Sequence, residues 1–570
     1  MNLRQLLTDN LDKSFASLGV DNPRALVFAT ANEEFGDYQA NGAMAIAKRV
    51  GRNPRSVAQE IVDQEPLSSL SAELEIGGPG FINIRLNDAF IGGAVSELRP
   101  LEQVDQPERI VIDYSSPNVA KELHVGHLRS TVIGDALARL FEFVGHTVIR
   151  QNHVGDWGTA FGKLIAYIDK EQSAEDLTVQ GIEKLYVAAN EQFEKDPIFA
   201  QIARQEVIKL QQQDSETLDK WNQIVQASLD HVQQIYSMLD ISLQLSDVRG
   251  ESSYNQDLAT IVDDLDKAGI LEVSDGAKCV FAEGFLRKDG SPLPMIVQKS
   301  DGGYLYHTTD LAALKHRSKS LHANRILYLT DARQIHHFQL LFAVGKLVGY
   351  ISNDVIPEHL VFGSVLDKNS EPFRTRGGNN VLLRELIHEG IDRALEIVRI
   401  KSSHLSQDEQ EEIARLVAVG AIKYADLSKN RTNDYRFDWD GMLSLDGNTA
   451  PYLQYAHARI CSIFARADLD LQAHLSHEIS LQHVSERALA LRLLRFAETL
   501  EQSLEERKPH YLCNYLYELT VHFMRFYENC PVLKAENARI RESRLSLSAK
   551  TAQILRVGLE NLGISLPVRM

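Results

Sequence analysis

The sequence has few of the features that mark membrane, disulfide-linked or zinc-binding proteins. Only 4 of its 570 residues are cysteine, and no two of them form a Cys-x-x-Cys pair. Neither a disulfide framework nor a structural zinc site is therefore expected. No apolar run approaches the length of a membrane-spanning helix, and the N-terminus has no charged-then-apolar signal segment. We predict a cytoplasmic protein with buried free thiols and no membrane partner.

Two common nucleotide-binding loops are also missing. Neither Gly-x-x-x-x-Gly-Lys-Ser/Thr nor Gly-x-Gly-x-x-Gly occurs in the chain. Basic residues are outnumbered, 60 against 78 acidic ones, which gives a formal net charge of −18. Such a charge argues against a protein that coats DNA or RNA without selectivity, and it is compatible with a shaped RNA surface carrying local basic patches.

The length of the chain and its 44% hydrophobic content predict three or four ordinary domains. Composition and periodicity divide it into a small α/β domain at 1–95, an α/β domain at 108–380 with a charged helical insertion at about 169–248, a connecting helical region at 381–447, and an all-α domain at 448–570.

The stretch from Asp113 to His127 joins the most informative elements. The apolar run 110–112 predicts a buried strand before it, and the segment 128–144 repeats apolar residues at helical spacing after it. A second strand is predicted at 147–150. Strand, loop, helix and strand in this order predict a right-handed βαβ unit, whose loop lies at the carboxyl edge of a parallel sheet, where such folds bind nucleotides.

Strands and helices continue to alternate beyond this unit. The expected elements are a hairpin at 279–281 and 295–297, a helix from 311, strands at 326–329 and 359–362, and a helix at 334–348. This order favours a doubly wound parallel sheet, a Rossmann-like arrangement. The strongest later helices are predicted at 449–467, 486–506, 510–528 and 545–562.

The central loop carries His124, Gly126 and His127 at the predicted helix start. Helix N–H groups and two imidazoles can face a phosphate, and glycine lets the backbone approach it closely. This arrangement suits the charge that builds on the α-phosphate of ATP as pyrophosphate leaves.

Together with Ser115-Ser116-Pro117-Asn118-Val119-Ala120-Lys121 before it and Asn152-His153-Val154-Gly155-Asp156-Trp157-Gly158 beyond it, this motif resembles the class I aminoacyl-tRNA synthetases, and among them the arginyl-tRNA synthetases of bacterial type. The resemblance covers nearly the whole chain. It implies a ligase that activates L-arginine with ATP and Mg²⁺ to arginyl-adenylate and then transfers arginine to the 3′ end of tRNA(Arg). Members of the family commonly need bound tRNA before activation, which we carry over as a hypothesis.

The resemblance also implies roles for the two ends of the chain. The segment Phe35-Gly36-Asp37-Tyr38-Gln39 is similar to the signature of an N-terminal domain that contacts the tRNA elbow. A purely stabilising role for that domain is the alternative. The helical C-terminus resembles an anticodon-binding bundle, in which Leu555 and Arg556 match part of an Asp-Ala-Leu-Arg motif. Tyr452, Tyr455 and Arg459 are expected to contact tRNA, because unpaired bases stack on aromatic rings; packing in the core is the alternative.

An arginine site must pair with a planar cation that stays protonated, and carboxylates do this best. By resemblance, the residues expected to bind arginine are Asp113, Ser116, Asn118, Tyr306, Asp310 and Gln334. Those expected to contact ATP are His124, Gly126, His127, Gly155, Asp156, Gly158, Arg374 and Arg376. His124, His127 and Lys121 are expected to be catalytic by stabilising charge on the phosphates.

The second class I signature, Lys-Met-Ser-Lys-Ser, is replaced by Phe373-Arg374-Thr375-Arg376-Gly377-Gly378. Many arginyl-tRNA synthetases degrade this motif and keep a lysine shortly before the first histidine of the other signature. Lys121 stands close before His124 and is expected to take that role, with Arg374 or Arg376 sharing it.

Other histidines are expected to have structural or solvated positions. His474, His477 and His483 lack a metal-binding His-Glu-x-x-His pattern and are predicted to be solvated, so no metal site is assigned. His336 and His337 begin a helix near the predicted site and are expected to be structural. His153 is either part of the site or a packed neighbour.

Two other functions stay open from the sequence. One is a class I synthetase for another amino acid; a glutamate or glutamine enzyme should offer cationic side-chain partners, and a cysteine enzyme commonly carries zinc ligands. The other is a non-catalytic tRNA-binding paralogue, favoured only by the degenerate loop at 373–378. A monomer is expected in each case.

Overall fold

The computed structural model describes residues 2–30, 32–70, 72–100, 103–171, 179–367, 369–373 and 381–570. The chain forms two compact units. Unit 1 combines Met1–Glu102 with Leu443–Asn561 and Ser565–Met570, and unit 2 combines Gln103–Met442 with Leu562–Ile564. Among the described helices, none is both long enough and apolar enough to cross a membrane.

Unit 2 is built on the predicted parallel sheet. Its four strands lie in the order β11 (Ile356–Phe362), β10 (Arg325–Asp331), β5 (Arg109–Asp113) and β6 (Thr147–Gln151), and every neighbouring pair is parallel. Helix α5 (Val125–Phe143) connects β5 to β6, and α12 (Ile335–Leu347) connects β10 to β11. The doubly wound arrangement is confirmed. Strands β5 and β10 meet at its centre, where the two halves of the sheet place their carboxyl ends together.

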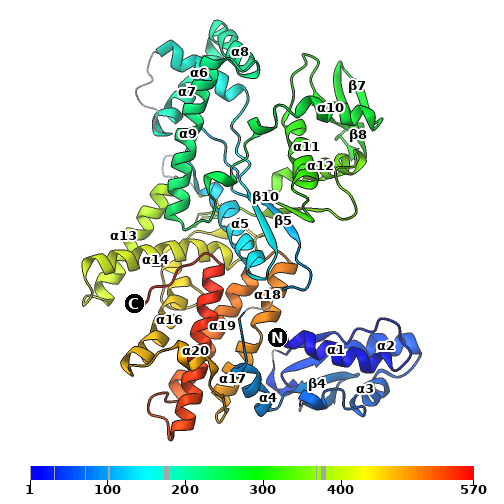
Figure 1. Cartoon of the computed structure of the whole chain (residues 1–570), viewed down its shortest axis with the longest axis vertical. Coiled ribbons are helices and arrows are strands. Elements are labelled where there is room, and N and C mark those ends of the chain that lie inside the picture. The colour runs from blue at the N-terminus through cyan, green and yellow to red at the C-terminus, as the bar shows by residue number, and fades with distance from the viewer. Residues whose placement is uncertain are drawn as a thin grey trace. The chain divides into compact units, whose positions relative to one another are not determined.

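The predicted insertion is a helical layer. It contains α7 (Val179–Lys195), α8 (Pro197–Gln211) and α9 (Ser215–Met238), and α6 (Thr159–Glu171), which begins ten residues before the predicted start at 169 (169 − 159 = 10), packs with them. Figure 1 shows these four helices gathered together in cyan and green. Apolar side chains from α6, α8 and α9, among them Leu164, Leu210 and Ile224, form their common core.

A small antiparallel sheet follows the insertion. It contains β7 (Leu271–Ser274), β8 (Ala277–Leu286) and β9 (Pro292–Gln298), flanked by α10 (Leu258–Lys267) and α11 (Tyr306–Lys315). The predicted hairpin is confirmed as β8 and β9. Helix α11 begins at Tyr306 rather than at Leu311, so Tyr306 and Asp310 lie in its first turns.

Helices and a short pair of strands complete unit 2 beyond β11. The two longest are α13 (Leu383–Lys401) and α14 (Gln407–Leu427), which are followed by the short α15 (Trp439–Met442). Strands β12 (Val365–Leu366) and β13 (Tyr435–Arg436) form a two-stranded parallel pair.

Unit 1 contains both ends of the chain. Its N-terminal part has an antiparallel sheet in the order β1 (Val27–Ala29), β2 (Tyr38–Ala40), β4 (Phe81–Arg85) and β3 (Glu73–Gly77), with helices α1 (Leu3–Ala16), α2 (Gly42–Val50), α3 (Pro54–Val62) and α4 (Asp88–Ser96). Its C-terminal part contains α16 (Ala450–Arg466), α17 (Val484–Leu494), α18 (Phe496–Glu505), α19 (His510–Asn529) and α20 (Ala538–Asn561).

The single helix predicted at 486–506 is wrong: it is two helices, α17 and α18, separated at Arg495. Arg495 has a ψ of 1°, which leaves the helical conformation, and its guanidinium donates a hydrogen bond to the carbonyl of Asp37 at 2.8 Å. Helix α20 begins seven residues before the predicted start at Leu545 (545 − 538 = 7).

The N-terminal signature segment binds the C-terminal helices within unit 1. Asp37 is buried and accepts two hydrogen bonds from the guanidinium of Arg487, each 2.8 Å long. Next to it, the hydroxyl of Tyr38 lies 3.2 Å from the carboxylate of Glu498. Two residues of this signature are therefore used to hold the two ends of the chain together.

Candidate active site

The two histidines of the central loop form the start of α5. The Nδ1 atom of His124 accepts a hydrogen bond from the backbone N–H of Gly126 at 3.0 Å. The Nδ1 atom of His127 accepts one from the backbone N–H of His124 at 3.2 Å. This reciprocal capping satisfies N–H groups that the helix itself leaves unpaired. Because each Nδ1 is an acceptor, the proton of each neutral ring is on Nε2, which makes it a hydrogen-bond donor.

Both imidazoles are neutral near pH 7. Burial lowers the pKa of His127 to about 4, with a further contribution from the adjacent His124. Burial and the charge of Lys121 lower the pKa of His124 as well. The start of α5 therefore presents two neutral donors beside the positive end of a helix dipole, an arrangement suited to phosphate oxygens.

Gly126 and Lys121 complete this part of the site. A Cβ atom on Gly126 would lie 2.7 Å from Cε1 of His124, so any side chain would displace the ring that caps the helix. Lys121 is exposed, and its ammonium lies 4.9 Å from the centre of the Tyr186 ring. Its charge acts on both histidines.

The loop before α5 is held in an unusual conformation. Ser115, Ser116 and Ala120 have φ angles of 66°, 45° and 68°, in the left-handed region that non-glycine residues rarely occupy. Such residues cost about 1–3 kcal/mol each and persist only where the surroundings hold them. The Ser115 hydroxyl accepts hydrogen bonds from Tyr236 at 2.6 Å and from Thr131 at 2.8 Å, which supply part of that restraint.

Asp113, expected to bind arginine, ends β5 and is already paired. Its Oδ2 atom lies 2.8 Å from Nη2 of Arg317, and the two side chains are 9% and 1% exposed. Its Oδ1 atom accepts a hydrogen bond from the Ser116 hydroxyl at 2.7 Å. Arg317 also donates to the side-chain oxygen of Gln151 at 2.8 Å. One carboxylate of the expected pocket is therefore bound by a guanidinium from the chain itself.

Asp310, the second expected carboxylate, is paired with histidines. Its Oδ2 atom accepts a hydrogen bond from Nε2 of His337 at 2.8 Å, and its Oδ1 atom lies 3.8 Å from Nε2 of His153. Burial alone would raise its pKa, but the hydrogen bond and charge of His337, with His153, lower the pKa below its ordinary value. The side chain is 25% exposed. Asp310 is therefore an ionised carboxylate that retains an accessible edge.

The other two predicted arginine contacts on this side flank His337. The Tyr306 ring is exposed and its centre lies 5.3 Å from that of His337. Gln334 precedes α12, one turn before His337, and is exposed. The Nδ1 atom of His337 is buried and has no hydrogen-bond partner among the described residues.

A continuous set of contacts joins the two carboxylates. The Ser116 hydroxyl donates to Asp113 and accepts a hydrogen bond from the backbone N–H of His153 at 3.0 Å. The backbone N–H of Ser116 donates to the side-chain oxygen of Asn152 at 3.0 Å. Since the His153 ring faces Asp310, the structure brings the two halves of the predicted arginine site together at the ends of β5 and β6.

Asn118 and Gly155 are adjacent in a backbone bridge. A Cβ atom on Gly155 would lie 2.1 Å from the side-chain oxygen of Asn118, so this position requires glycine. Gly158 has a φ of 102°, a conformation that also favours glycine.

The Asp156 carboxylate is used inside the protein. It accepts hydrogen bonds from the backbone N–H and hydroxyl of Ser252, at 2.8 and 2.7 Å, and the residue is 5% exposed. A Cβ atom on Gly250 would lie 2.2 Å from it. Asp156 thus fixes the turn at 250–252.

Three residues near the site were not among the predicted site residues. Arg317 and Glu251 belong to no recognised motif, and His337 was expected to be structural. Arg317 pairs with Asp113, and His337 pairs with Asp310. Glu251 is close enough to Asp310 and Asp156 for their negative charges to act on its carboxyl group. Burial, with those two charges, raises the pKa of Glu251 to about 7. Neither helical periodicity nor a sequence motif predicts these three side chains as site residues, because the residues that they contact are far away in the sequence.

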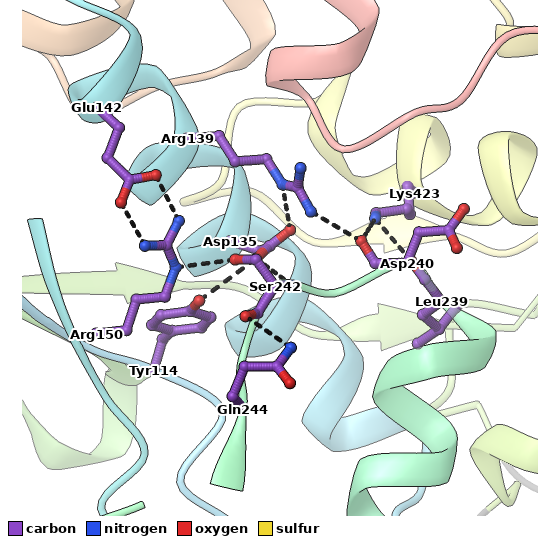
Figure 2. Close-up of polar contacts among 10 residues, drawn as sticks. All are labelled: Tyr114, Asp135, Arg139, Glu142, Arg150, Leu239, Asp240, Ser242, Gln244 and Lys423. Carbon is purple, nitrogen blue, oxygen red and sulfur yellow. Dashed lines mark hydrogen bonds and ion pairs between the residues drawn. The ribbon is translucent and has the colours of Figure 1, made fainter. Parts of the chain in front are cut away.

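Further along α5 than the two histidines, a polar network centred on the buried Asp135 anchors the helix (Figure 2). Asp135 accepts hydrogen bonds from Nε of Arg139 at 2.8 Å, from the backbone N–H of Ser242 at 2.8 Å, and from the Ser242 hydroxyl. Lys423 of α14 donates to the carbonyls at 239–240, at 2.7 and 3.1 Å, and burial lowers its pKa to about 8. The network ties α5 to the end of the helical insertion and to α14.

Of the remaining predicted contacts, three are described in unit 1 and two are not described. Arg374 and Arg376 are outside the described residues. In unit 1, Tyr452, Tyr455 and Arg459 share one face of α16 and are half-buried. The Arg459 guanidinium lies 4.7 Å from the centre of the Tyr527 ring and 6.0 Å from that of Tyr455. This face therefore presents a guanidinium stacked with aromatic rings.

Comparison with known families and proteins gives matches along the whole chain. Residues 1–86 match the arginyl tRNA synthetase N-terminal domain, residues 94–439 the catalytic domain of class I tRNA synthetases (R), and residues 453–570 the DALR anticodon binding domain. Arginine–tRNA ligases of Marinomonas sp. and Haemophilus influenzae are 46% and 47% identical to the chain, each covering 100% of both sequences.

Solved structures show the same similarity in three dimensions. The arginyl-tRNA synthetase of Plasmodium falciparum superposes with a TM-score of 0.86 at 31% identity, covering 100% of this chain and 99% of that one. The arginyl-tRNA synthetase of Thermus thermophilus superposes with a TM-score of 0.85 at 26% identity, covering 100% of both.

Proposed function

The chain belongs to the arginyl-tRNA synthetase family, and from this premise we propose that it joins L-arginine to the 3′ end of tRNA(Arg) in two steps. In the first step, the arginine carboxylate attacks the α-phosphorus of ATP, and pyrophosphate leaves as arginyl-adenylate forms. In the second step, a terminal ribose hydroxyl of the tRNA attacks the carbonyl carbon of the adenylate, and AMP leaves. No protein nucleophile takes part, so catalysis consists of positioning and electrostatic stabilisation.

The observation that supports this proposal most directly is the meeting of two kinds of group at the ends of β5 and β6. The start of α5 offers the Nε2–H donors of His124 and His127, and the segment after β6 brings His153 to the ionised Asp310. A phosphate-binding helix start and a carboxylate for a guanidinium are the two requirements of an enzyme that activates arginine with ATP.

For arginine, we assign the guanidinium to the accessible edge of Asp310, with the Tyr306 ring beside it. Asp113 acts through Ser116, because its other oxygen is held by Arg317. Ser116 and Asn118 are proposed to bind the α-amino and carboxylate groups of arginine. Gln334 is proposed to contribute only after its exposed side chain turns toward the ligand.

For ATP, the neutral imidazoles of His124 and His127 donate hydrogen bonds to phosphate oxygens, and the Lys121 ammonium adds positive charge. ATP is proposed to arrive as its magnesium complex, with Mg²⁺ as part of the substrate. Gly126, Gly155 and Gly158 would let the backbone approach the nucleotide. Arg374 and Arg376 are retained as proposed phosphate contacts, and Asp156 is proposed to shape the pocket through the turn at 250–252.

For tRNA, the face of α16 that carries Tyr452, Tyr455 and Arg459 is proposed to stack on anticodon bases. We also propose that the protein acts as a monomer in the cytoplasm. Size-exclusion chromatography with light scattering tests whether the protein is a monomer, and cell fractionation tests whether it is cytoplasmic.

The test of the function is aminoacylation of total tRNA with each labelled amino acid in turn, with wild type compared to Asp310→Asn and His124→Ala. We expect wild type to charge tRNA with arginine alone and both variants to lose most of this activity. Charging with a different amino acid would contradict the arginine assignment while leaving the ATP site intact. Binding of tRNA without any charging would instead identify a non-catalytic paralogue.

A further inference from the structure

Three metal-ligating side chains converge in unit 1, the part of the chain that does not contain the active site. His474 lies in a short 3-10 helix, Gln472–Ser476, His477 follows it, and Glu542 projects from α20. One carboxylate oxygen of Glu542 lies 3.3 Å from Nε2 of His474 and 3.2 Å from Nδ1 of His477. One ligand atom from each residue lies within 4.8 Å of the other two. We propose that these residues form a binding site for Zn²⁺.

The two separations at Glu542 match those between neighbouring ligands of a tetrahedral ion. Bonds of about 2.0–2.1 Å to imidazole nitrogen and carboxylate oxygen place neighbouring ligand atoms of a tetrahedron about 3.3 Å apart. A charge-assisted hydrogen bond between an imidazolium and a carboxylate is shorter, about 2.7–2.9 Å. The two distances at Glu542, 3.3 and 3.2 Å, are close to the separation expected between two ligands of one ion.

The orientation of His474 supports this assignment independently. Its Nδ1–H donates a hydrogen bond to the carbonyl of Asp470 at 2.8 Å. In a neutral ring this bond leaves a lone pair on Nε2, the atom that faces Glu542. Either a proton on Nε2 or a metal ion must then lie between this lone pair and the carboxylate oxygen of Glu542. A ligating histidine usually has its other ring nitrogen bonded to a carbonyl or carboxylate in the same way.

The surroundings hold two of the three ligands in place. His474 is 6% exposed, so the prediction that it is solvated is wrong; the fold packs it against the Phe464 ring. Two hydrogen bonds join the loop that follows His477 to α20. The Ser543 hydroxyl accepts one from the backbone N–H of Ser480 at 3.0 Å and donates one to the carbonyl of Ser480 at 3.1 Å. The site is thus built between two segments that already bind each other.

The ligand set selects the metal. Two imidazoles and one carboxylate are the ligands typical of Zn²⁺, and three protein ligands leave the fourth position for water. The side chains of His477 and Glu542 are 44% and 39% exposed, so the ion and its water can reach the site. The bound ion would link the turn after α16 to α20. A sequence pattern misses it because Glu542 is 65 residues beyond His477 (542 − 477 = 65).

The test uses the full-length protein without a histidine tag, treated with EDTA and dialysed. Titration with ZnCl2 by calorimetry and elemental analysis compare wild type with His477→Ala and Glu542→Gln. His388→Ala, which removes an exposed histidine from α13 in unit 2, is the control. We expect wild type and His388→Ala to bind one Zn²⁺ that the two ligand variants bind at least about 100-fold more weakly. We also expect Co²⁺ to give the visible bands of tetrahedral coordination with wild type and His388→Ala, and not with His477→Ala or Glu542→Gln.

Both ligand variants change partly exposed side chains and leave the buried His474 in place, so they are expected to fold. Thermal unfolding of the EDTA-treated proteins checks this, and added Zn²⁺ should raise the melting temperature of wild type and of His388→Ala only. Equal Zn²⁺ binding by wild type and the two ligand variants would overturn the proposal, as would a wild type that binds no Zn²⁺. Because the readouts are metal content and melting temperature, they do not depend on the synthetase reaction.

Discussion

The guanidinium of Arg317 lies 2.8 Å from the carboxylate of Asp113, and both side chains are almost fully buried. The negative charge of Asp113, at the end of β5, is therefore already paired with the guanidinium of Arg317 when no substrate is bound. Its remaining oxygen orients Ser116, which in turn holds the segment carrying His153. The substrate guanidinium is left with Asp310, whose carboxylate is hydrogen-bonded to His337 and lies 3.8 Å from the ring of His153.

Arg317→Met should destabilise the protein and weaken arginine binding. Removing one partner of a buried ion pair leaves an uncompensated charge, which costs about 3–5 kcal/mol. Urea unfolding measures the first effect, and the KM for arginine, compared with that for ATP, measures the second. The double variant with Asp113→Asn should regain much of the lost stability, since it removes the stranded charge. A single variant as stable as wild type would show that the pair contributes nothing.

Asp310→Asn should raise the KM for arginine and leave the KM for ATP nearly unchanged. Loss of one partner of a desolvated, hydrogen-bonded charge pair costs 2 kcal/mol or more, which corresponds to a change of about 30-fold. Steady-state arginine-dependent aminoacylation measures it. Asp354→Asn, at an exposed position after α12, is the matched control and should behave as wild type. Equal effects on both substrates would place Asp310 outside the arginine pocket.

His124→Ala and His127→Ala should each slow ATP–pyrophosphate exchange, assayed with tRNA present, by about 10²- to 10³-fold, the usual loss when one preorganised donor is removed. Their donor role requires neutral rings. Since the folded pKa of His127 is about 4, below the ordinary 6.5, its protonation cannot shape the rate between pH 6 and 8. A rate limb in that range that disappears in His127→Ala would contradict the assignment.

The pKa of His127 also has a consequence for stability. The unfolded chain binds a proton at this residue between pH 6.5 and about 4, and the folded chain does not. Its contribution to the free energy of unfolding is therefore present above pH 6.5 and is lost as the pH falls toward 4. His127→Ala should lose less stability than wild type between pH 6.5 and 4.5, as measured by urea unfolding at a series of pH values.

Glu251 should make arginine binding depend on pH near neutrality. Its pKa of about 7 means that a second carboxylate ionises near Asp310 as the pH rises from 6 to 8. The added negative charge attracts a guanidinium, so the KM for arginine should fall over this range. Glu251→Gln should flatten the profile, and Glu283→Gln, an exposed position on β8, should not.

The raised pKa of Glu251 also affects stability. Arginine binding should strengthen as the pH rises, whereas the free energy of unfolding should decrease. Between pH 4.5 and 7 the folded chain keeps a proton on Glu251 that the unfolded chain has lost. The free energy of unfolding should therefore decrease across this window because of Glu251, and the decrease should be smaller in Glu251→Gln. Unfolding in urea at pH 5 and pH 8 compares the two proteins. Identical pH dependence in both would show that the residue titrates normally.

The sequence was sufficient for the central βαβ unit because its signals are local. An apolar run, a proline, a helical repeat and a glycine follow one another within residues 110–150, and each acts on its neighbours. Asp113 and His124 are predicted as site residues from one continuous motif and from its resemblance to a known family.

The pairings around the site could not be predicted in this way. Arg317 reaches Asp113 only because β10 lies beside β5, and Asp310 meets His337 only because α11 and α12 pack together. The break at Arg495 has the same origin, since its partner, Asp37, is in the first forty residues. Partners this distant are set by tertiary packing, which residue spacing does not record.

The hydrogen bonds between Asp37 and Arg487 join residues 450 positions apart. On the ribosome, at about 5–20 residues per second, Asp37 is made roughly 20–90 s before Arg487. During that interval the N-terminal sheet has neither the guanidinium that pairs with Asp37 nor the Arg495 side chain that covers Tyr38. Unit 1 therefore cannot be completed during synthesis of the first half of the chain. Its assembly belongs to the last stage of translation, after the catalytic sheet has left the exit tunnel.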